Sequence, residues 1–474
     1  MIDTSAPLSP GWWLTTLAYN MQLRSSRLEL LNSYLTGNAP LPEGAAGLRE
    51  AFQQFQRKAR INPSELIVEA VQERMTVSGF RIGDAEELSK DANRIWSYNE
   101  LDTYSSDVHG DMLGLTGGYA IVGPPDDSGI PVITHEDPRL VITSPDPKHP
   151  SRQRAALKLF RDDITGKDTA YLYLPGVVYV AQRDNGRANE PLLPDISGFD
   201  WVPGMAPMRW PSGFEDVVPV VFWPNKNGVA EFERHTDTID RINYVVLQRL
   251  VIIAMQAYRQ RALKGSNNLP EVEIDADGNP VLDSKGDPIP IDLGAIMKPG
   301  PGSLWLLPEG VDLWESQSTD FTQVLAAAKD DYRSLAAETR TPIYMLMPDG
   351  ANQSAEGASA AREQLVYKAS DRIKRASYGW NQAMTLALRF AGVTANVVDM
   401  NTLWLPPERL SLAERADAAS KLTAAGVPWK TIMTDIMQFP EGKVEEMETQ
   451  RISDAMNTAL TLPPAPVSGG ASGV

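Results

Sequence analysis

Cysteine and histidine, two residue types that often act as nucleophiles, bases or metal ligands, are absent or rare in this sequence. The chain of 474 residues has no cysteine, which excludes disulfides, thiol nucleophiles and thiolate metal ligands. Its histidines lie far apart and none belongs to a metal-ligand motif such as H-E-x-x-H, so surface or locally satisfied roles are favoured over a metal centre. The four residues are His109, His135, His149 and His235.

Two stretches match ligand loops only in part. Asp275 and Asp277 in IDADGNPVLD follow the start of a calcium-loop pattern, but the rest of that pattern and its closing glutamate are absent, which favours a β-hairpin turn. LGLTGGYAIVG is rich in glycine but opens a strand pattern rather than a helix, which favours a turn over a nucleotide site. The sequence also lacks phosphate-loop, nucleophile-elbow and recognisable acid/base patterns. We therefore expect no catalytic residue, no metal and no cofactor.

The composition narrows the class of protein. Hydrophobic residues at 42% and charged residues at 22% are typical of a folded chain, and the length corresponds to about three domain-sized units. The formal net charge of −17 opposes nonspecific adsorption to nucleic acid or to anionic membranes. The most apolar stretch, YVVLQRLVIIAMQAY, is interrupted by Gln248 and Arg249 and is too short for a membrane span, and the first residues lack a signal-peptide pattern. These features favour a soluble, cytoplasmic protein.

The first half of the chain shows helical patterns and then strand patterns. Apolar residues between Leu14 and Leu35 follow helical spacing, and INPSELIVEAVQ predicts a second helix with Asn62 as N-cap, Glu65 bonding back to it and Gly79 as a stop signal. From Gly117 to about position 225, short β-branched runs predict a mixed region of strands, with a hairpin that turns at Pro175-Gly176.

The second half predicts long helices around a compact interruption. One helix is expected from Glu231 to about Leu263, with acidic residues in its first turns complementing the helix dipole, and another from Thr319 to Arg340. Between them, residues 265–318 carry two turn signals, DGNP and KGDP. A third helix is expected from Ser354 to Phe390, and Gly379 could permit a bend there. Its inner face is marked by Ala358, Leu365, Ala369, Ile373, Ala376, Trp380, Ala383 and Ala387. A helical tail follows, the last residues should be disordered, and no repeat with a fixed period is evident.

The loop between the second and third helices has an unusual composition. Pro348 and Gly350 break the helical pattern, and Ser354 can cap the helix that follows. No lysine or arginine occurs between Arg340 and Arg362. The tip of the loop therefore offers neutral hydrogen-bonding groups and one acid.

The order of segments resembles the portal proteins, or head-to-tail connectors, of long-tailed bacteriophages. The resemblance extends from about Tyr34 to Pro428 and rests on the order of its stretches rather than on one motif. The early stretches are YLTGNAPLP, VQERMTVSGFRIGD, IWSYNELDTYSSDVHGDMLGLTGGYAIVG, HEDPRLVITSPDP and VVPVVFWPN. The most distinctive is TRTPIYMLMPDGANQSAEGASAAREQLVYKASDRIKR with YGWNQAMTLAL, and LSLAERADAASKLTAAGVP follows it.

The resemblance implies an α+β portal fold and a division of the chain. A mixed α/β wing would comprise residues 1–230, stem helix 1 residues 231–263, a small β-containing clip residues 264–318, and stem helix 2 with its connection residues 319–345. Residues 346–357 would form a channel loop, 358–391 a long helix that joins the wing, 392–462 a helical crown, and 463–474 a disordered tail. This crown and tail are short for the family.

The resemblance also implies a function without catalysis. Portal proteins form rings of generally about twelve subunits at one capsid vertex, and double-stranded DNA enters and leaves through their channel without sequence specificity. The implied partners are further copies of the chain, the large subunit of the terminase motor, a head-completion adaptor, and the major capsid and scaffolding proteins. The implied location is the virion, with the host cytoplasm during assembly. Twelve acidic copies would surround DNA with a charge on the order of −200, which suits passage rather than tight binding.

Three groups of residues are candidate sites on this interpretation. In the stem, Leu250 and Ile253 would pack against neighbouring subunits. In the clip, the acidic turns would form a docking surface for a partner; the alternative is a solvated pair of turns without a partner. The residues concerned are Asp275, Asp277, Asp283, Lys285 and Asp287. In the channel loop, the tip would face DNA; the alternative is an ordinary helix–helix connection. The residues at the tip are Asp349, Asn352, Gln353 and Ser354. The alternatives for the whole protein are a helical scaffold or capsid component without a channel, and an enzyme with an unrecognised site.

Overall fold

The computed structural model describes most of the chain. The described residues are 2–42, 50–83, 89–184, 192, 194–257, 261–264, 271–275, 277–291, 312–315, 322–347, 355–408, 412–439 and 441–461. They fall into two units. The first contains Met1–Pro40, Ile61–Ile239 and Tyr332–Val474, and the second contains Leu41–Arg60 and Asp240–Asp331.

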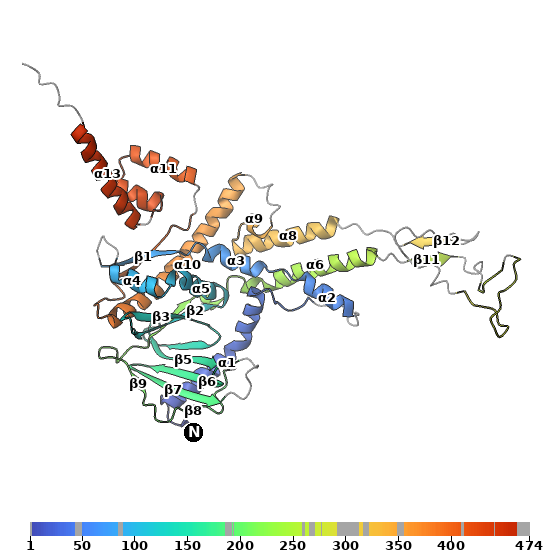
Figure 1. The fold of residues 1–474 in the computed structure, drawn as a ribbon, viewed down its shortest axis with the longest axis horizontal. Helices are drawn as coiled ribbons and strands as arrows, with labels where there is room; N and C mark the ends of the chain where they lie inside the picture. The colour runs from blue at the N-terminus through green and yellow to red at the C-terminus, as the bar shows by residue number, and fades with distance from the viewer. Residues whose placement is uncertain are drawn as a thin grey trace, which may run out of the picture. The chain divides into compact units, whose positions relative to one another are not determined.

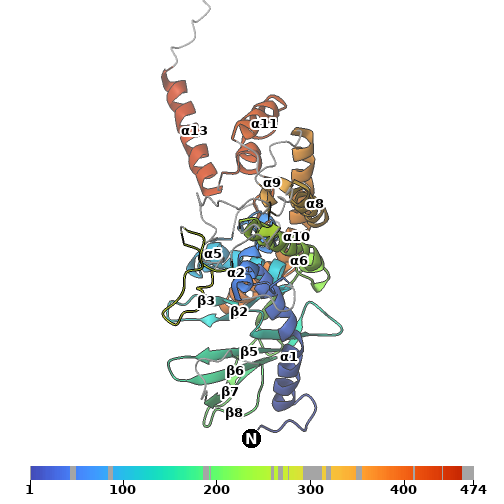
Figure 2. The ribbon, with the colours of Figure 1, turned by 90° about the vertical axis from the view of Figure 1, so that its right-hand side faces the viewer.

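In its described residues, the first unit contains three antiparallel sheets. Figures 1 and 2 show their strands. The largest has the order β4-β5-β6-β7-β8, with β9 also pairing with β7; a second has the order β10-β2-β3; and β1 pairs with β13. The strands are β1 (Val77–Ile82), β2 (Gly117–Pro125), β3 (Pro131–Glu136), β4 (Val141–Pro145), β5 (Gln153–Asp162), β6 (Lys167–Leu174), β7 (Val177–Asp184), β8 (Asp200–Trp201), β9 (Met208–Arg209), β10 (Val220–Pro224) and β13 (Met400–Trp404). The hairpin predicted at Pro175-Gly176 is confirmed, because Leu174 pairs with Val177 across that two-residue loop.

Helix α1 (Pro10–Leu35) covers the largest sheet. Leu14, Leu17 and Met21 are buried against sheet residues that include Leu157 and Leu172. The predicted apolar stripe therefore meets the alternate side chains that one face of a sheet presents. Figure 2 shows α1 running along this sheet.

The other helices of the first unit surround α10 (Ala355–Phe390). They include α3 (Pro63–Gln72), α4 (Lys90–Tyr98), α5 (Leu101–Gly114), the short α9 (Ile343–Leu346) and the end of α8 (Thr322–Thr339). Most of the predicted inner face of α10 is buried, while Ile373 is half-buried. The buried residues are Leu365, Ala369, Ala376, Trp380, Ala383 and Ala387. α10 is continuous through Gly379. A Cβ on Gly379 would lie 2.2 Å from Nε1 of Trp223, so the glycine makes room for that ring.

The start of α3 agrees in part with the sequence, and its end does not. Asn62 is the N-cap residue before Pro63, and Glu65 accepts a hydrogen bond from the side-chain amide of Asn62 at 2.9 Å. The side chain of Asn62 accepts no hydrogen bond from the first turn of the helix, and its amide also donates to the carbonyl oxygen of Leu35. Gly79 does not end the helix, which finishes at Gln72. It lies at a register shift within β1, where glycine accommodates a bulge.

The helix expected over 231–263 is shorter in the structure. α6 runs from Thr236 to Ala257, and a 3₁₀ turn, η2 (Glu233–His235), precedes it. Glu231 lies before both because its carboxylate binds cations of α10. At the other end, Arg261–Lys264 form β11, which pairs with β12 (Asp312–Glu315) and so cannot continue the helix.

The second unit contains α2 (Glu50–Ala59), most of α6, the β11–β12 pair, two turns within residues 271–291, and the first part of α8. Within it, Arg241 of α6 donates to Asp331 of α8 at 2.9 Å. The two helices lie side by side at that point (Figure 1). α8 ends at Thr339, and the residues expected at its start, Thr319 to Phe321, lie outside the described residues.

The chain continues with helices after β13. These are α11 (Leu412–Ala424), α12 (Trp429–Thr431), the π-helical turn η5 (Ile432–Ile436) and α13 (Glu441–Thr461). Gly426 has a φ of +82°, as expected for a residue that ends a helix. Within the described residues, no helix is both long and apolar enough to cross a membrane.

Candidate functional site

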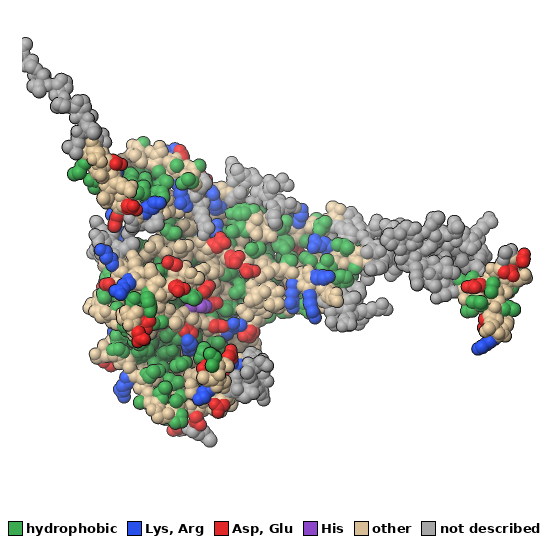
Figure 3. Space-filling view, viewed as in Figure 1, with side chains coloured by type: hydrophobic (Ala, Val, Ile, Leu, Met, Phe, Trp, Pro, Cys, Tyr) green, Lys and Arg blue, Asp and Glu red, His purple; other side chains and the backbone are tan. Residues whose placement is uncertain are grey.

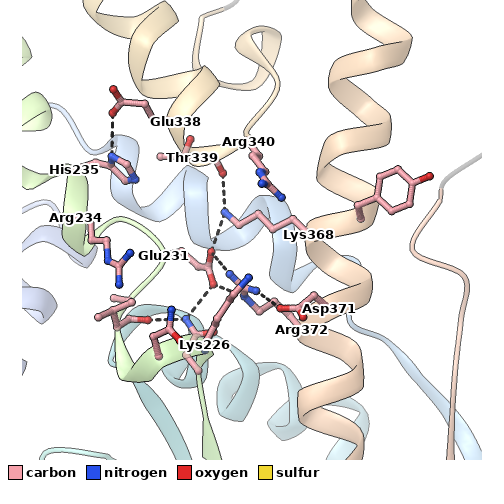
Figure 4. Close-up of a pocket in the computed structure, with 15 residues that line it drawn as sticks. Lys226, Glu231, Arg234, His235, Glu338, Thr339, Arg340, Lys368, Asp371 and Arg372 are labelled. Carbon is pink, nitrogen blue, oxygen red and sulfur yellow. Dashed lines mark hydrogen bonds and ion pairs between the residues drawn. The ribbon is translucent and has the colours of Figure 1, made fainter.

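A cluster of charged side chains gathers where three parts of the first unit meet (Figure 4). They are the segment between β10 and α6, the end of α8, and the middle of α10. Asn225 organises the first part, because its side-chain amide donates to the carbonyl oxygen of Val229 at 2.8 Å and to Glu231 at 3.0 Å. This folds residues 225–231 into a tight turn that directs Glu231 inward.

The carboxylate of Glu231 is the centre of the cluster. Oε2 lies 2.9 Å from Nζ of Lys368, and Oε1 accepts from Nε of Arg372 at 2.6 Å. The side chains of Glu231, Lys368 and Arg372 are 4%, 6% and 11% exposed, respectively. Removing one partner from such a buried ion pair typically costs about 3–5 kcal/mol, because the other charge is left without compensation.

The environment keeps Glu231 ionised. Burial by itself would raise the pKa of Glu231, but the charges of Lys368 and Arg372, with their hydrogen bonds and that of Asn225, outweigh burial and lower the pKa to about 2. Burial lowers the pKa of Lys368, and the nearby cations Arg372 and Arg340 act in the same direction, while Glu231 opposes them.

The same lysine fixes the end of α8. Nζ of Lys368 donates to the carbonyl oxygen of Thr339 at 2.9 Å. There the helix ends in a Schellman motif, in which the amide of Thr341 bonds to the carbonyl of Ala336 and Arg340 has a left-handed φ of +54°. The hydrogen bond therefore closes the base of residues 340–367, the segment that contains the expected channel loop.

Of the sites expected from the sequence, the stem residues lie within the described part of the chain and the channel-loop residues do not. The four channel-loop residues, Asp349, Asn352, Gln353 and Ser354, lie outside the described residues. The two stem residues are described: Leu250 is half-buried and Ile253 is 49% exposed. They lie on α6, in the second unit.

The expected clip residues lie on two similar turns. Oδ1 of Asp275 accepts from the amides of Asp277 and Asn279, and Oδ1 of Asp283 accepts from those of Lys285 and Asp287, all at 2.8–3.0 Å. The hydrogen bond from the amide of Asp287, then that from Lys285, lowers the pKa of Asp283. Asp275 and Asp283 therefore hold the turns. Among the described residues, the side chains of Asp277, Lys285 and Asp287 make no hydrogen bond.

The strands beside these turns form a closed triangle. The backbone amide of Glu273 donates to the carbonyl oxygen of Ile289, and the amide of Ile289 donates to the carbonyl oxygen of Val281. The amide of Val281 donates in turn to the carbonyl oxygen of Glu273, and all three distances are 2.8–2.9 Å. Each of the three segments thus pairs with both others. The two turn signals expected from the sequence are thus copies of one short pattern, D-x-x-G-x-P at 275–280 and again at 283–288.

The histidines take different local roles. His109 is buried, accepts a hydrogen bond from Nε1 of Trp380 at 2.8 Å, and has its pKa lowered by burial to about 3. His135 lies 2.6 Å from Asp111, and His235 lies 3.1 Å from Glu338. In the described part of the chain, no three His, Asp or Glu side chains are grouped so that they could hold a metal ion.

The sequence patterns do not predict the Glu231 cluster. They place Glu231 in the first turn of the expected helix, and Lys368 and Arg372 belong to no motif. A signal was present, because Lys368 and Arg372 are four residues apart and lie next to the predicted apolar face of α10. Cations placed beside a buried stripe indicate a buried acid, but the sequence does not indicate which of 61 acidic residues it is.

Comparison with known proteins gives consistent matches. A family model described as "Phage portal protein, SPP1 Gp6-like" matches residues 14–455. The portal protein of Mycobacterium phage D29 is 24% identical over 401 residues, which cover 81% of this chain and 76% of that protein. The portal protein of Mycobacterium phage L5 is 24% identical over 440 residues, which cover 88% of this chain and 83% of that protein.

Solved structures of gene transfer agent particles also match. A chain from the neck of an empty particle aligns with 84% of this chain and 96% of its own length, at 13% identity and a TM-score of 0.47. A chain from the virion of the native particle aligns with 86% and 99%, at 12% identity and a TM-score of 0.45.

Proposed function

Because this chain belongs to the SPP1 Gp6-like family of phage portal proteins, we propose that its copies assemble into a ring of about twelve subunits around a channel for double-stranded DNA. The ring occupies one vertex of the capsid in the virion, and assembly takes place in the host cytoplasm. DNA enters through the channel during packaging and leaves through it during ejection, without recognition of its sequence.

The observation that carries the ring is the exposed apolar surface of α6. Between Tyr244 and Ile253 the helix is apolar nearly all round, yet Tyr244 is 45% and Ile253 49% exposed in the single chain. The apolar residues between them, except buried Leu247, are half-buried. Leu325 of α8, in the same unit, is 42% exposed. Figure 3 shows apolar side chains on the surface along these helices. A helix that is apolar on every side needs neighbours around it, and adjacent subunits of a ring supply them.

The division of the chain that we propose is the one implied by the portal family. We assign residues 1–230 to the wing, α6 and α8 to the stem, residues 264–318 to the clip, 346–357 to the channel loop, 358–391 to the helix that joins the wing, and 392–462 to the crown. The closed turns at 271–291 suit a clip, because they form a small structure that does not need a large core.

The charge of the chain supports passage of DNA. With 61 acidic and 44 basic residues, each copy carries −17, which repels the phosphate backbone. The channel loop contributes no cation, so its contacts with phosphates are weak and independent of sequence.

The partners follow the order of assembly. The clip docks the large terminase subunit during packaging and the head-completion adaptor afterwards, and the ring joins the major capsid and scaffolding proteins at the vertex. Asp277, Lys285 and Asp287 are the clip side chains available for docking, because Asp275 and Asp283 hold the turns.

Imaging of the purified protein by electron microscopy tests this function. We expect closed rings with a central hole. Filaments, sheets or single subunits without a hole would instead support a helical scaffold or capsid component. Purified protein that hydrolysed nucleotides or DNA with a divalent metal would support the third alternative, an enzyme.

A further inference from the structure

The charged cluster around Glu231 borders a cavity that its ion pairs do not fill. The cavity has a volume of about 300 Å³ and lies between the 225–235 segment, the end of α8 and α10. Its wall carries more positive than negative charge in a protein whose net charge is −17. The cations are Lys226, Arg234, Arg340, Lys368 and Arg372, and the acids are Glu231, Glu338 and Asp371.

The acids of the wall already have partners. Glu231 binds Lys368 and Arg372. Asp371 accepts from Arg372 and from Arg375, and Glu338 binds His235. Among the described residues, by contrast, Lys226, Arg234 and Arg340 form no ion pair and no side-chain hydrogen bond as donors. In Figure 4, the guanidinium groups of Arg234 and Arg340 lie on opposite sides of the Glu231 carboxylate.

The buried Lys368 also has one N–H donor without an acceptor among the described residues. An ammonium group has three N–H donors. Nζ of Lys368 uses one for Glu231 and one for the carbonyl of Thr339. In the described part of the chain, the third has no acceptor, although the residue is 7% exposed and lines the cavity.

The backbone at Arg340 indicates that its side chain matters. The left-handed position that ends a Schellman motif favours glycine, because a Cβ is strained there. Here an arginine occupies it, with φ +54°. Its charge also acts unfavourably on Lys368. An arginine that strains the backbone and repels a buried lysine is explained by an anion that binds both.

We propose that the cavity bordered by Lys226, Arg234, Arg340 and Lys368, which we term the cation pocket, binds a phosphate group. Guanidinium forks match the oxygens of a tetrahedral phosphate in number and spacing. The group comes from free inorganic phosphate or from a nucleic-acid backbone. The proposal is independent of the ring and of the channel, because every residue of the pocket lies in the first unit of one chain.

The test is titration of the purified full-length protein with inorganic phosphate by isothermal calorimetry. Arg340→Gly is the decisive variant, because glycine relieves the strained backbone while it removes the charge. We expect Arg340→Gly and Arg234→Gln each to weaken phosphate binding about tenfold, the effect of one hydrogen bond to a charged group. Thermal unfolding of Arg340→Gly without phosphate should stay unchanged or occur at a higher temperature.

Lys374→Ala is the matched control, because Lys374 is an exposed cation of α10 that does not line the pocket. It should bind phosphate as the unmodified protein does. Short duplex DNA distinguishes the two sources of the phosphate group. If the DNA competes with inorganic phosphate, and this competition disappears in Arg340→Gly, the pocket binds a nucleic-acid backbone. If the DNA does not compete, the pocket binds free phosphate.

Three results would overturn the proposal. They are absence of saturable phosphate binding to the unmodified protein, equal binding by the double variant of Arg234 and Arg340, and displacement of phosphate by acetate at equal concentration. The last result would show a general carboxylate site, suited to an acidic side chain of a second copy.

Discussion

Nζ of Lys368 lies 2.9 Å from the carbonyl oxygen of Thr339, so one buried side chain joins the two ends of the segment that contains residues 346–357. The same ammonium group binds Glu231, which lies just before α6. The beginning of one proposed stem helix and the end of the other are thereby attached to α10 at a single point. Changes in this cluster should alter the stability of the whole junction.

The first prediction concerns the buried acid. Glu231→Gln keeps the shape of the side chain but leaves Lys368 and Arg372 without their counter-charge, so we expect a loss of about 3–5 kcal/mol in the free energy of unfolding. Urea denaturation measures it. Asp417→Asn is the control, because the exposed Lys421–Asp417 pair of α11 should contribute less than about 1 kcal/mol. Equal effects of the two variants would contradict the role assigned to Glu231.

The second prediction is the pH dependence of the same group. The pKa of Glu231 is lowered to about 2 in the folded chain, so the stability from its ionisation is present above its unfolded pKa of about 4.5 and is lost as pH falls from there towards 2. Unfolding measured between pH 6 and about 2.5 should become easier with acid. The slope should be smaller in Glu231→Gln. Parallel curves for the two proteins would show that another group is responsible.

The third prediction addresses the ring. Leu250→Asp and Ile253→Asp should each leave an unpaired charge in the contact between subunits, so light scattering should detect a smaller assembly. Ile164→Asp is the control, because Ile164 is 96% exposed at the β5–β6 turn, far along the sequence from α6. Intact rings in both stem variants would refute the proposed packing of α6.

The fourth prediction separates docking from turn structure in the clip. Asp277→Lys with Asp287→Lys reverses two charges, and we expect weaker association with the terminase motor, most clearly at low salt. Asp283→Ala should instead remove the acceptor of two backbone amides and loosen the turn. Binding that stays constant across a salt series would leave only the interpretation of a solvated pair of turns.

The fifth prediction concerns the loop of residues 346–357. Asn352→Lys with Gln353→Lys should add phosphate contacts and slow the passage of DNA. Heads should still assemble but fill slowly or incompletely, and added salt should relieve the defect. Asn352→Ser with Gln353→Ser is the neutral control and should fill heads normally. Normal filling by the lysine variant would place the loop away from DNA.

The sequence alone determined the elements whose pattern is local. The stripe from Leu14 to Leu31, the hairpin at Pro175-Gly176 and the inner face of α10 follow from residue spacing, because side chains in helices and strands repeat with fixed periods. The order of segments also indicated the family, which the match over residues 14–455 then showed.

Only the tertiary structure decided which distant residues meet. Glu231 and Arg372 are separated by 141 positions, and nothing in the local pattern of either pairs them. The early part of the expected helix became a turn because a buried cation pair on α10 binds the Glu231 carboxylate more favourably than a helix dipole does. Gly379 likewise has its reason in Trp223, whose ring needs the space that a side chain would fill. Local periodicity specifies elements, whereas burial and charge pairing between elements specify the site, and those depend on the folded chain.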